Sequence, residues 1–238
     1  MQREVVLVIG KTGSGKTTWA KNFIRDKTRV LILDAGFGDY SAVEHENLSD
    51  LIDETEKQNC QGSGFFRFSY TPRSSESGVI LDLARVTGNC WLVLEEADRL
   101  DDPRYMPEYD EVISRGRHYG VNILAVSLYP FKLPADLRRQ ATRLICYRMH
   151  EPRDLDYLYD VIGEDVALLP NLKPFHYLDW RAGHGSQIVK PNGKAVETGR
   201  DSRVSGPDEP QNPAEPAGDG PANELEDPKP LAEPEPSL

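Results

Sequence analysis

The sequence has few cysteines and no long apolar run. Its three cysteines, Cys60, Cys90 and Cys146, are far apart and form neither a CxxC pair nor a Cys/His cluster. This spacing excludes the usual zinc sites and is typical of reduced thiols in a cytosolic protein. No stretch of about 18 apolar residues occurs, which is the length that a membrane-spanning helix needs. A strand-like segment begins at residue 4, so we expect neither a signal peptide nor a membrane span.

Basic residues are too few to balance the acidic ones. The 238 residues include 28 Lys and Arg against 39 Asp and Glu, which gives a net charge of −11. Residues 201–238 alone contribute −8 of this charge, because ten acidic residues there stand against two basic ones. Since the rest of the chain carries only about −3, the acidic composition does not exclude a nucleic-acid partner. With so little net charge, any contacts with a nucleic acid are expected to be few and local.

Residues 197–238 also lack aromatic side chains and contain half of the 18 prolines. A segment of this composition cannot bury enough apolar surface to offset the entropy lost on ordering. We therefore predict a folded domain over residues 1–196 and a disordered, Pro-rich acidic tail over residues 197–238. A specific docking role for the tail is the alternative.

Apolar runs and helical patterns alternate along the predicted domain. Strands are predicted at 4–10, 29–35, 64–70, 90–96, 121–128 and 143–149, and helices at 16–27, 47–58, 76–87, 106–116, 134–141 and 152–163. The alternation predicts an α/β fold with a mainly parallel sheet, helices on both faces and ligands at the carboxyl ends of the strands. Residues 174–196 alternate apolar and polar side chains around Gly183 and Gly185, which predicts a terminal hairpin.

The segment GKTGSGKT, residues 10–17, follows the first predicted strand and precedes the first helix. In this setting it predicts a phosphate-binding loop, whose backbone N–H groups point at phosphate oxygens. We predict that Lys16 reaches the β- and γ-phosphates and that the Thr17 hydroxyl binds Mg²⁺. The predicted nucleotide-binding residues are Gly10, Lys11, Thr12, Gly13, Ser14, Gly15, Lys16, Thr17 and Thr18. A Gly-rich turn with an incidental lysine is the alternative.

Two adjacent carboxylates end the apolar strand in CWLVLEEADRL, residues 90–100. Phosphate hydrolysis needs one carboxylate to hold Mg²⁺ and another group to orient and deprotonate the attacking water. We expect this strand to neighbour the phosphate-loop strand, and we assign Glu95 to Mg²⁺ and Glu96 to the water. Solvent-facing charge at a strand end is the alternative. No NKxD motif for guanine occurs, so ATP is the predicted nucleotide.

These motifs, together with RGRHYGVN, SLYP, LPADLRRQAT and YRMHEPRDLDYL, resemble those of the FtsK/HerA-type ATPases, which pump double-stranded DNA through ring oligomers. The resemblance covers about residues 3–165 and depends on the order and spacing of the motifs. Similar members of that family are the genome-packaging ATPases of membrane-containing tailless viruses, and the filamentous-phage zonula occludens toxin is a cousin. The resemblance implies a RecA-like P-loop core.

The resemblance also implies a polar sensor at the end of the fifth predicted strand, usually Gln after Ser or Thr. The amide is absent here, so Ser127 would sense the γ-phosphate alone or together with Tyr129, with a buried structural serine as the alternative. In a ring, an arginine can reach the γ-phosphate of the neighbouring subunit. Arg117 is our first candidate and Arg115 the second, and a solvated helix end is the alternative for either.

Other arginines near these motifs have less definite roles. Arg99 follows the two-carboxylate strand and is expected to point away from the site. Arg138, Arg139 and Arg143 form a basic group that would contact phosphates of DNA or nucleotide, or face water. We expect at least one of these three to face water.

The implied function is ATP-driven translocation of double-stranded DNA, and a bare motor core resembles the enzymes that package a viral genome into a preformed capsid. The expected partners are double-stranded DNA, a homo-oligomeric ring, foremost a hexamer, and capsid or virion-vertex proteins. The expected location is the host cytoplasm and a packaging vertex of the virion. The alternative is a nucleotide-gated assembly protein of the zonula-occludens-toxin type that does not move DNA. Glu96 favours the enzyme, because a pure switch needs no water-activating acid.

Overall fold

The computed structural model describes residues 3–34, 40–60, 64–73, 76–99 and 107–196. The acidic tail predicted at residues 197–238 lies outside the described residues. The predicted division between domain and tail after residue 196 stays a prediction. No helix in the described ranges is long and apolar enough to cross a membrane.

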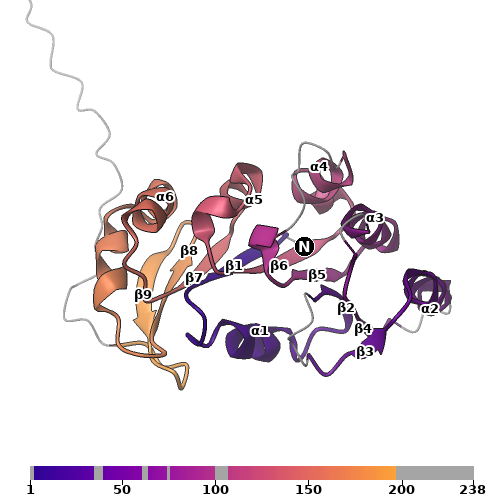
Figure 1. The fold of residues 1–238 in the computed structure, drawn as a ribbon, viewed down its shortest axis with the longest axis horizontal. Coiled ribbons are helices and arrows are strands. Elements are labelled where there is room, and N and C mark those ends of the chain that lie inside the picture. The colour runs from indigo at the N-terminus through magenta and orange to yellow at the C-terminus, as the bar shows by residue number, and fades with distance from the viewer. Residues whose placement is uncertain (1–2, 35–39, 61–63, 74–75, 100–106, 197–238) are drawn as a thin grey trace, which may run out of the picture. The chain divides into compact units, whose positions relative to one another are not determined.

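A nine-stranded sheet runs through the described residues in the order β3-β4-β2-β5-β6-β1-β7-β8-β9 (Figure 1). Its strands are β1 (Val5–Ile9), β2 (Arg29–Leu33), β3 (Val43–His45), β4 (Phe66–Tyr70), β5 (Trp91–Leu94), β6 (Asn122–Ser127), β7 (Arg143–Tyr147), β8 (Tyr177–Arg181) and β9 (Gly185–Val189). All neighbours from β3 to β7 are parallel, whereas β7, β8 and β9 are antiparallel. The predicted mainly parallel sheet and terminal hairpin are both confirmed.

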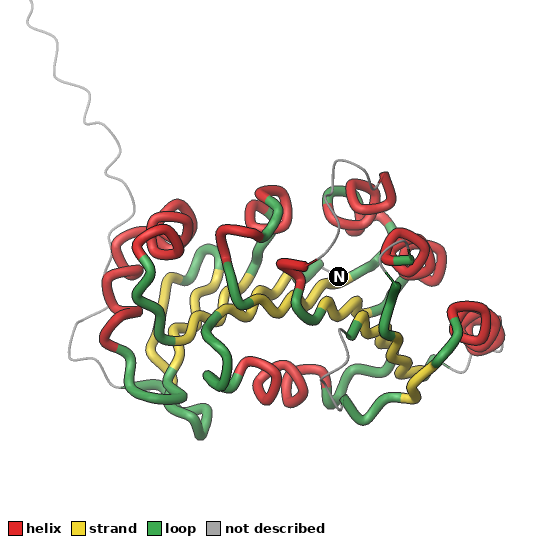
Figure 2. The backbone as a smooth tube through the Cα atoms, viewed as in Figure 1, coloured by secondary structure: helices red, strands yellow, loops and turns green. Residues whose placement is uncertain are grey.

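Helices cover both faces of this sheet (Figure 2). The helices are α1 (Lys16–Ile24), α2 (Leu48–Cys60), α3 (Ser77–Thr87), α4 (Pro107–Ile113), α5 (Ala135–Arg139) and α6 (Pro152–Ile162), with 3₁₀ segments η1 (Ala97–Arg99), η3 (Gly116–His118), η4 (Pro130–Lys132) and η5 (Gly163–Asn171). Helix α1 lies on one face, and α3, α4, α5 and α6 lie on the other (Figure 1). Each of the six helices predicted from periodicity is present, with ends that differ by a few residues.

Apart from the three-residue 3₁₀ turns, two elements in the described ranges were not predicted. Strand β3 has only three residues, VEH, none of which is buried, so it has no apolar run that could reveal it. It exists because its backbone pairs with β4 at the end of the sheet. The 3₁₀ segment η5 follows α6 and includes Pro170, a residue that signals a helix end when read from sequence alone.

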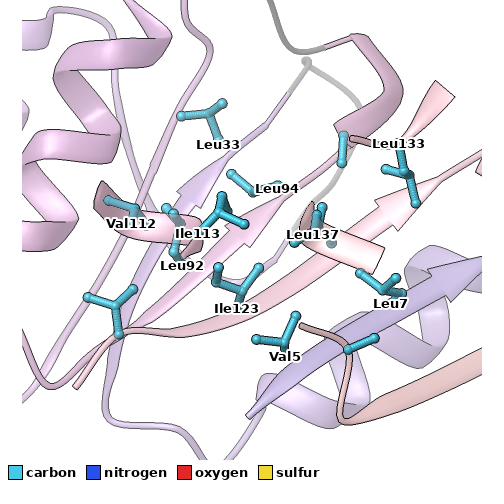
Figure 3. Close-up of a cluster of buried hydrophobic side chains, with 14 of the residues drawn as sticks. Val5, Leu7, Leu33, Leu92, Leu94, Val112, Ile113, Ile123, Leu133 and Leu137 are labelled. Atoms are coloured by element: carbon cyan, nitrogen blue, oxygen red, sulfur yellow. The ribbon is translucent and has the colours of Figure 1, made fainter. Parts of the chain in front are cut away.

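Alternate residues of the central strands pack into two separate hydrophobic clusters, one on each face of the sheet. In β1, Val5, Leu7 and Ile9 belong to the larger cluster, whereas Val6 and Val8 belong to the cluster beneath α1. This alternation follows from the two-residue period of a strand and explains why the central strands are apolar throughout. Figure 3 shows the larger cluster, where side chains of α4 and α5 lie against those of β1, β5 and β6.

Arg3 fastens the end of α4 to the start of β1. Its guanidinium donates hydrogen bonds to the carbonyl oxygens of Val112 and Ile113 at 2.7 and 2.6 Å, and to that of Val121 at 3.0 Å. The last carbonyls of a helix have no partner within the helix, so a cation there satisfies them and offsets the helix dipole. Arg3 thereby fixes the segment between α4 and β6.

We expect Arg3→Leu to lower the stability of the domain by about 2–4 kcal/mol, because three carbonyl groups lose a charged donor. For a domain of this size the loss corresponds to a decrease in Tm of roughly 5–10 °C. Thermal unfolding followed by circular dichroism measures it, with Arg25→Leu on the exposed end of α1 as the control. Equal melting temperatures for both variants and the wild type would contradict the anchoring role.

Candidate nucleotide-binding site

Residues 10–17 join the carboxyl end of β1 to the amino end of α1. Gly15 has φ 104° directly before the first helical residue, a backbone conformation that favours glycine. Gly10 is required for a different reason: a Cβ atom there would lie 2.7 Å from the Tyr147 Cβ and 2.9 Å from the Ser14 Oγ. The loop is therefore packed closely against the end of β7. The loop lies between a strand and a helix, which is the setting that the phosphate-loop motif requires.

Lys16 begins α1, and its Nζ donates a hydrogen bond to the Lys11 carbonyl oxygen at 3.0 Å. Burial lowers the pKa of Lys16, while the carboxylates of Glu95, Asp98 and Glu96 act in the opposite direction. The ammonium group thus lies in a partly desolvated site that faces three acids. Ser14 contributes a buried Oγ that has no hydrogen-bond partner among the described residues. These are the donors that a phosphate would use.

The two-carboxylate strand, β5, does not neighbour the phosphate-loop strand, and that expectation was wrong. Strand β6 lies between them, paired with β1 on one side and β5 on the other. The carboxyl ends of the three strands still meet at one edge of the sheet, because all are parallel and Ile9 is in register with Ser127. At about 4.8 Å per strand, β1 and β5 are roughly 10 Å apart.

Glu95 lies at this edge in a mostly buried position. Its carboxylate accepts hydrogen bonds from the hydroxyls of Thr17 and Tyr40, and its backbone N–H donates to the Leu33 carbonyl oxygen at 2.9 Å. Burial raises the pKa of Glu95, and burial together with the nearby Glu95 raises that of Tyr40. The pairing of Thr17 with Glu95 brings together the two predicted Mg²⁺ ligands. Tyr40 was missed because nothing in its local sequence marks it.

Glu96 has the backbone conformation φ 50°, which is uncommon for a residue with a side chain. Its Oε2 lies 2.9 Å from Arg99 Nη1. The contact has the distance of an ion pair but not the direction of a hydrogen bond, since this buried oxygen accepts none from the described part of the chain. The expectation that Arg99 points away was wrong: the single 3₁₀ turn η1 brings it back over Glu96.

Asp98 joins the ends of β5 and β6. Its Oδ1 accepts hydrogen bonds from Ser127 Oγ at 2.9 Å and from the Leu128 backbone N–H at 3.1 Å, and Ser127 Oγ in turn accepts one from the Tyr129 N–H at 3.2 Å. Ser127 is fully buried, and Tyr129 is exposed. Ser127 therefore has a structural bond to Asp98 in addition to its place at the site. Sequence reasoning missed Asp98, although it lies two residues after Glu96.

A cavity of about 420 Å³ lies between Lys16 of the loop and the acids Glu95 and Glu96. Its lining residues are Thr12, Gly13, Lys16, Thr17, Asp34, Glu95, Glu96, Arg99, Val126, Ser127 and Leu128. No cluster of three or more His, Cys, Asp or Glu suited to a metal occurs within the described ranges. Mg²⁺ usually takes one or two protein ligands and completes its shell with phosphates and water, so it does not require such a cluster. Thr17 and Glu95 could hold it.

A second cavity, of about 680 Å³, lies on the other side of the loop beside Ser14, Gly15 and Thr18. Its aromatic lining comprises Trp19, Phe23, Tyr147, Phe175 and Tyr177, with Arg143 among them. Phe175 is largely exposed and has φ 59°, so an apolar ring is held open to solvent in a strained conformation. The lining comes from α1, β7, β8 and the segments flanking the hairpin, which explains why no local pattern identified it.

The remaining loop residue, Lys11, is exposed and forms an ion pair with Glu151 at 3.7 Å. Arg115 and Arg117 are exposed too, and they lie before β6, at the amino edge of the sheet. Strand β6 has six residues, so about 20 Å separates them from the carboxyl edge of the same subunit. Arg115 forms an ion pair with Glu111 at 2.7 Å. Neither arginine is brought to the cavity of its own chain.

The basic group of α5 and β7 divides into three environments. Arg138 donates to the Tyr157 carbonyl oxygen at 2.8 Å and is largely buried. Arg139 is 74% exposed, as expected for at least one of the three. Arg143 makes a two-pronged contact with the buried carboxylate of Asp179 at 2.8 and 2.7 Å. Two of these arginines are thus structural, and Arg139 faces water.

Comparison with solved structures finds several proteins that share this fold. The genome packaging NTPase B204 of Sulfolobus turreted icosahedral virus 2, solved with AMPPCP, matches with a TM-score of 0.65 and 19% identity over 79% of this chain and 97% of its own. The chain shares the fold of this packaging NTPase. The bacterial conjugative coupling protein TrwB matches with a TM-score of 0.53 and 12% identity, over 79% of this chain and 84% of its own. The structural resemblance to the packaging ATPases is confirmed at the level of the fold.

A further similar structure is VirB4 of Thermoanaerobacter pseudethanolicus, with a TM-score of 0.50 and 12% identity over 81% of this chain and 89% of its own. No family model matches the sequence, and no curated protein is similar to it in sequence. The similarity is therefore one of three-dimensional structure. The roles of the individual site residues stay predictions.

We expect Asp98→Ala to destabilise the domain by about 1–3 kcal/mol, because the Ser127 hydroxyl and the Leu128 N–H lose their common acceptor. Asp98→Asn is the matched control, since its amide oxygen can accept both hydrogen bonds. Urea unfolding of the two variants measures the difference. If the alanine variant is no less stable than the asparagine variant, the bond between β5 and β6 is not significant.

Proposed function

We propose that the chain is a Mg²⁺-dependent ATPase. The observation that carries the proposal is the cavity at the carboxyl edge, in which Lys16 faces Glu95 and Glu96 across β6. Glu96 has a strained backbone and one buried oxygen, Oε2, without a hydrogen bond, as expected of a group that receives a proton from water. A charge that merely faces solvent at a strand end would be hydrated.

The side chains divide the work of hydrolysis. Lys16 and the backbone of the loop bind the phosphates, and Thr17 and Glu95 hold Mg²⁺, which when bound neutralises charge that develops on the phosphate oxygens. Glu96 orients and deprotonates the attacking water. Ser127 lies between these groups at the end of β6, where it can contact the γ-phosphate side of the cavity.

The aromatic cavity beside Thr18 is suited to the base of the nucleotide. It adjoins the loop, and Tyr147 links the two by donating a hydrogen bond to the Gly15 carbonyl oxygen at 3.2 Å. Rings such as Phe175 and Trp19 offer stacking surfaces for a purine. We infer that the base enters here while the triphosphate extends towards Glu96.

We further propose that hydrolysis drives translocation of double-stranded DNA, and that the DNA is a viral genome packaged into a preformed capsid. The similarity to a genome packaging NTPase and to a conjugative coupling protein supports this proposal. It entails a homo-oligomeric ring, foremost a hexamer, and partners among the capsid or vertex proteins. It also entails a location in the host cytoplasm and at a virion vertex.

DNA-stimulated ATP turnover tests the proposed function. We expect purified protein to hydrolyse ATP with Mg²⁺ and to do so faster with duplex DNA, because a translocase couples the two. Turnover that DNA does not affect would favour the nucleotide-gated assembly protein. Absence of any nucleotide binding would refute both.

We expect Lys16→Ala to abolish nucleotide binding or turnover, since the triphosphate loses its main cation. Glu96→Gln should still bind ATP but hydrolyse it at least about a hundredfold more slowly, the scale of a lost general base. Equilibrium binding of a fluorescent ATP analogue and steady-state phosphate release separate the two effects. Full activity of Glu96→Gln would contradict the assignment of Glu96 as the base that deprotonates the attacking water.

The position of Arg117 at the amino edge predicts that it acts in trans. We expect Arg117→Ala subunits, inactive alone, to recover measurable turnover when mixed with inactive Glu96→Gln subunits, because some interfaces then pair an intact Glu96 with an intact arginine. Phosphate release from titrated mixtures measures this. An activity that neither mixing nor protein concentration changes would exclude the trans-acting arginine.

A further inference from the structure

Arg99 lies in the cavity on the side of the acids, although no motif predicted it there. It is the last residue of the short turn η1, and its backbone N–H donates a hydrogen bond to the Glu96 carbonyl oxygen at 2.7 Å. Arg99 lines the same cavity as Thr12 and Gly13 of the loop. The bond from Ser127 to Asp98 fixes the turn on β6. Arg99 thus has a backbone fixed by hydrogen bonds and a guanidinium that is largely exposed.

The contact between Arg99 and Glu96 is easily broken. The arginine side chain is 69% exposed and that of Glu96 33% exposed, and the contact lacks the direction of a hydrogen bond. Exposed ion pairs of this kind contribute little free energy. A terminal phosphate offers a guanidinium more negative charge and two oxygens in the spacing that its N–H groups match.

We propose that Arg99 binds the γ-phosphate of a nucleoside triphosphate in its own subunit and leaves Glu96 when it does so. Without nucleotide, Arg99 rests on Glu96. With a triphosphate, the guanidinium moves to the terminal phosphate, and the Glu96 oxygen becomes free to accept a hydrogen bond from water. A diphosphate leaves the pair intact. The inference rests on the proposed ATPase function and adds a residue that distinguishes triphosphate from diphosphate.

The role differs from that of Arg115 and Arg117. Those two lie at the opposite edge of the sheet, so the only nucleotide they could contact is bound to another subunit. Arg99 needs no neighbour, because it lines the cavity of its own chain. Discrimination between ATP and ADP should therefore persist in dilute, dissociated subunits.

Binding of ATPγS and ADP to the full chain tests the proposal without hydrolysis. We expect Arg99→Ala to weaken ATPγS binding by about tenfold or more, the scale of one charged hydrogen bond, with a much smaller effect on ADP. Arg85→Ala is the control: it breaks a comparable pair with Asp82, at 2.6 Å, on α3 outside the cavity. Equal losses for the two nucleotides, or none, would overturn the inference.

A double variant distinguishes a direct contact between Arg99 and the γ-phosphate from the effect of Arg99 on the net charge of the site. Arg99→Ala alone leaves Glu96 uncompensated, which by itself repels the more highly charged triphosphate. Arg99→Ala combined with Glu96→Gln restores the net charge of the wild-type site, and we still expect its preference for ATPγS over ADP to be about tenfold weaker than that of the wild type. If the double variant keeps the wild-type preference, Arg99 only balances charge and the proposal fails.

The proposed move of Arg99 from Glu96 to the γ-phosphate also predicts how Glu96→Gln alone changes the affinity for ATPγS. In wild-type protein part of the binding free energy is used to break the Arg99–Glu96 pair, so Glu96→Gln should bind ATPγS up to about fivefold more tightly. Weaker binding by Glu96→Gln would contradict the exchange. Wild-type protein that binds neither nucleotide would refute the ATPase itself, whereas binding that ignores Arg99 would refute this inference only.

Discussion

The site depends on the parallel alignment of β1, β6 and β5, whose carboxyl ends lie at one edge of the sheet. Because β6 separates the other two, the phosphate-binding loop and the acids are roughly two strand spacings apart. That gap accommodates the cavity of about 420 Å³ between Lys16 and Glu96.

The turn after β5 shows how a strained residue is held. Glu96 adopts φ 50° and buries an oxygen without a hydrogen bond, both of which are unfavourable. The next turn offsets this cost, since Asp98 accepts hydrogen bonds from Ser127 and Leu128. Ser127, which we predicted as a sensor, is consequently part of the framework that holds the acid. A substitution at Ser127 should therefore alter the position of Glu96, and a substitution at Glu96 should alter that of Ser127.

Cations are distributed over two edges of the sheet with different reach. Lys16 and Arg99 line the cavity, whereas Arg115 and Arg117 extend from the segment that Arg3 anchors at the amino edge. The first pair can respond to a nucleotide within one subunit, and the second can respond only to a neighbour's. In the proposed ring, each subunit would therefore contact its own nucleotide through Arg99 and the nucleotide of the next subunit through Arg115 or Arg117.

The sequence by itself determined the α/β class, the six helices, the parallel strands with their terminal hairpin, and the loop at residues 10–17. Those features are local: they follow from apolar runs, helical periodicity and a contiguous glycine-rich motif. Only the tertiary structure decided that β6 lies between β1 and β5, that Arg99 turns back onto Glu96, and that aromatic residues from α1 and β7 form a second cavity beside the loop. Strand order and the direction of a side chain depend on contacts between segments distant in the chain, and a single sequence carries no local signal for them.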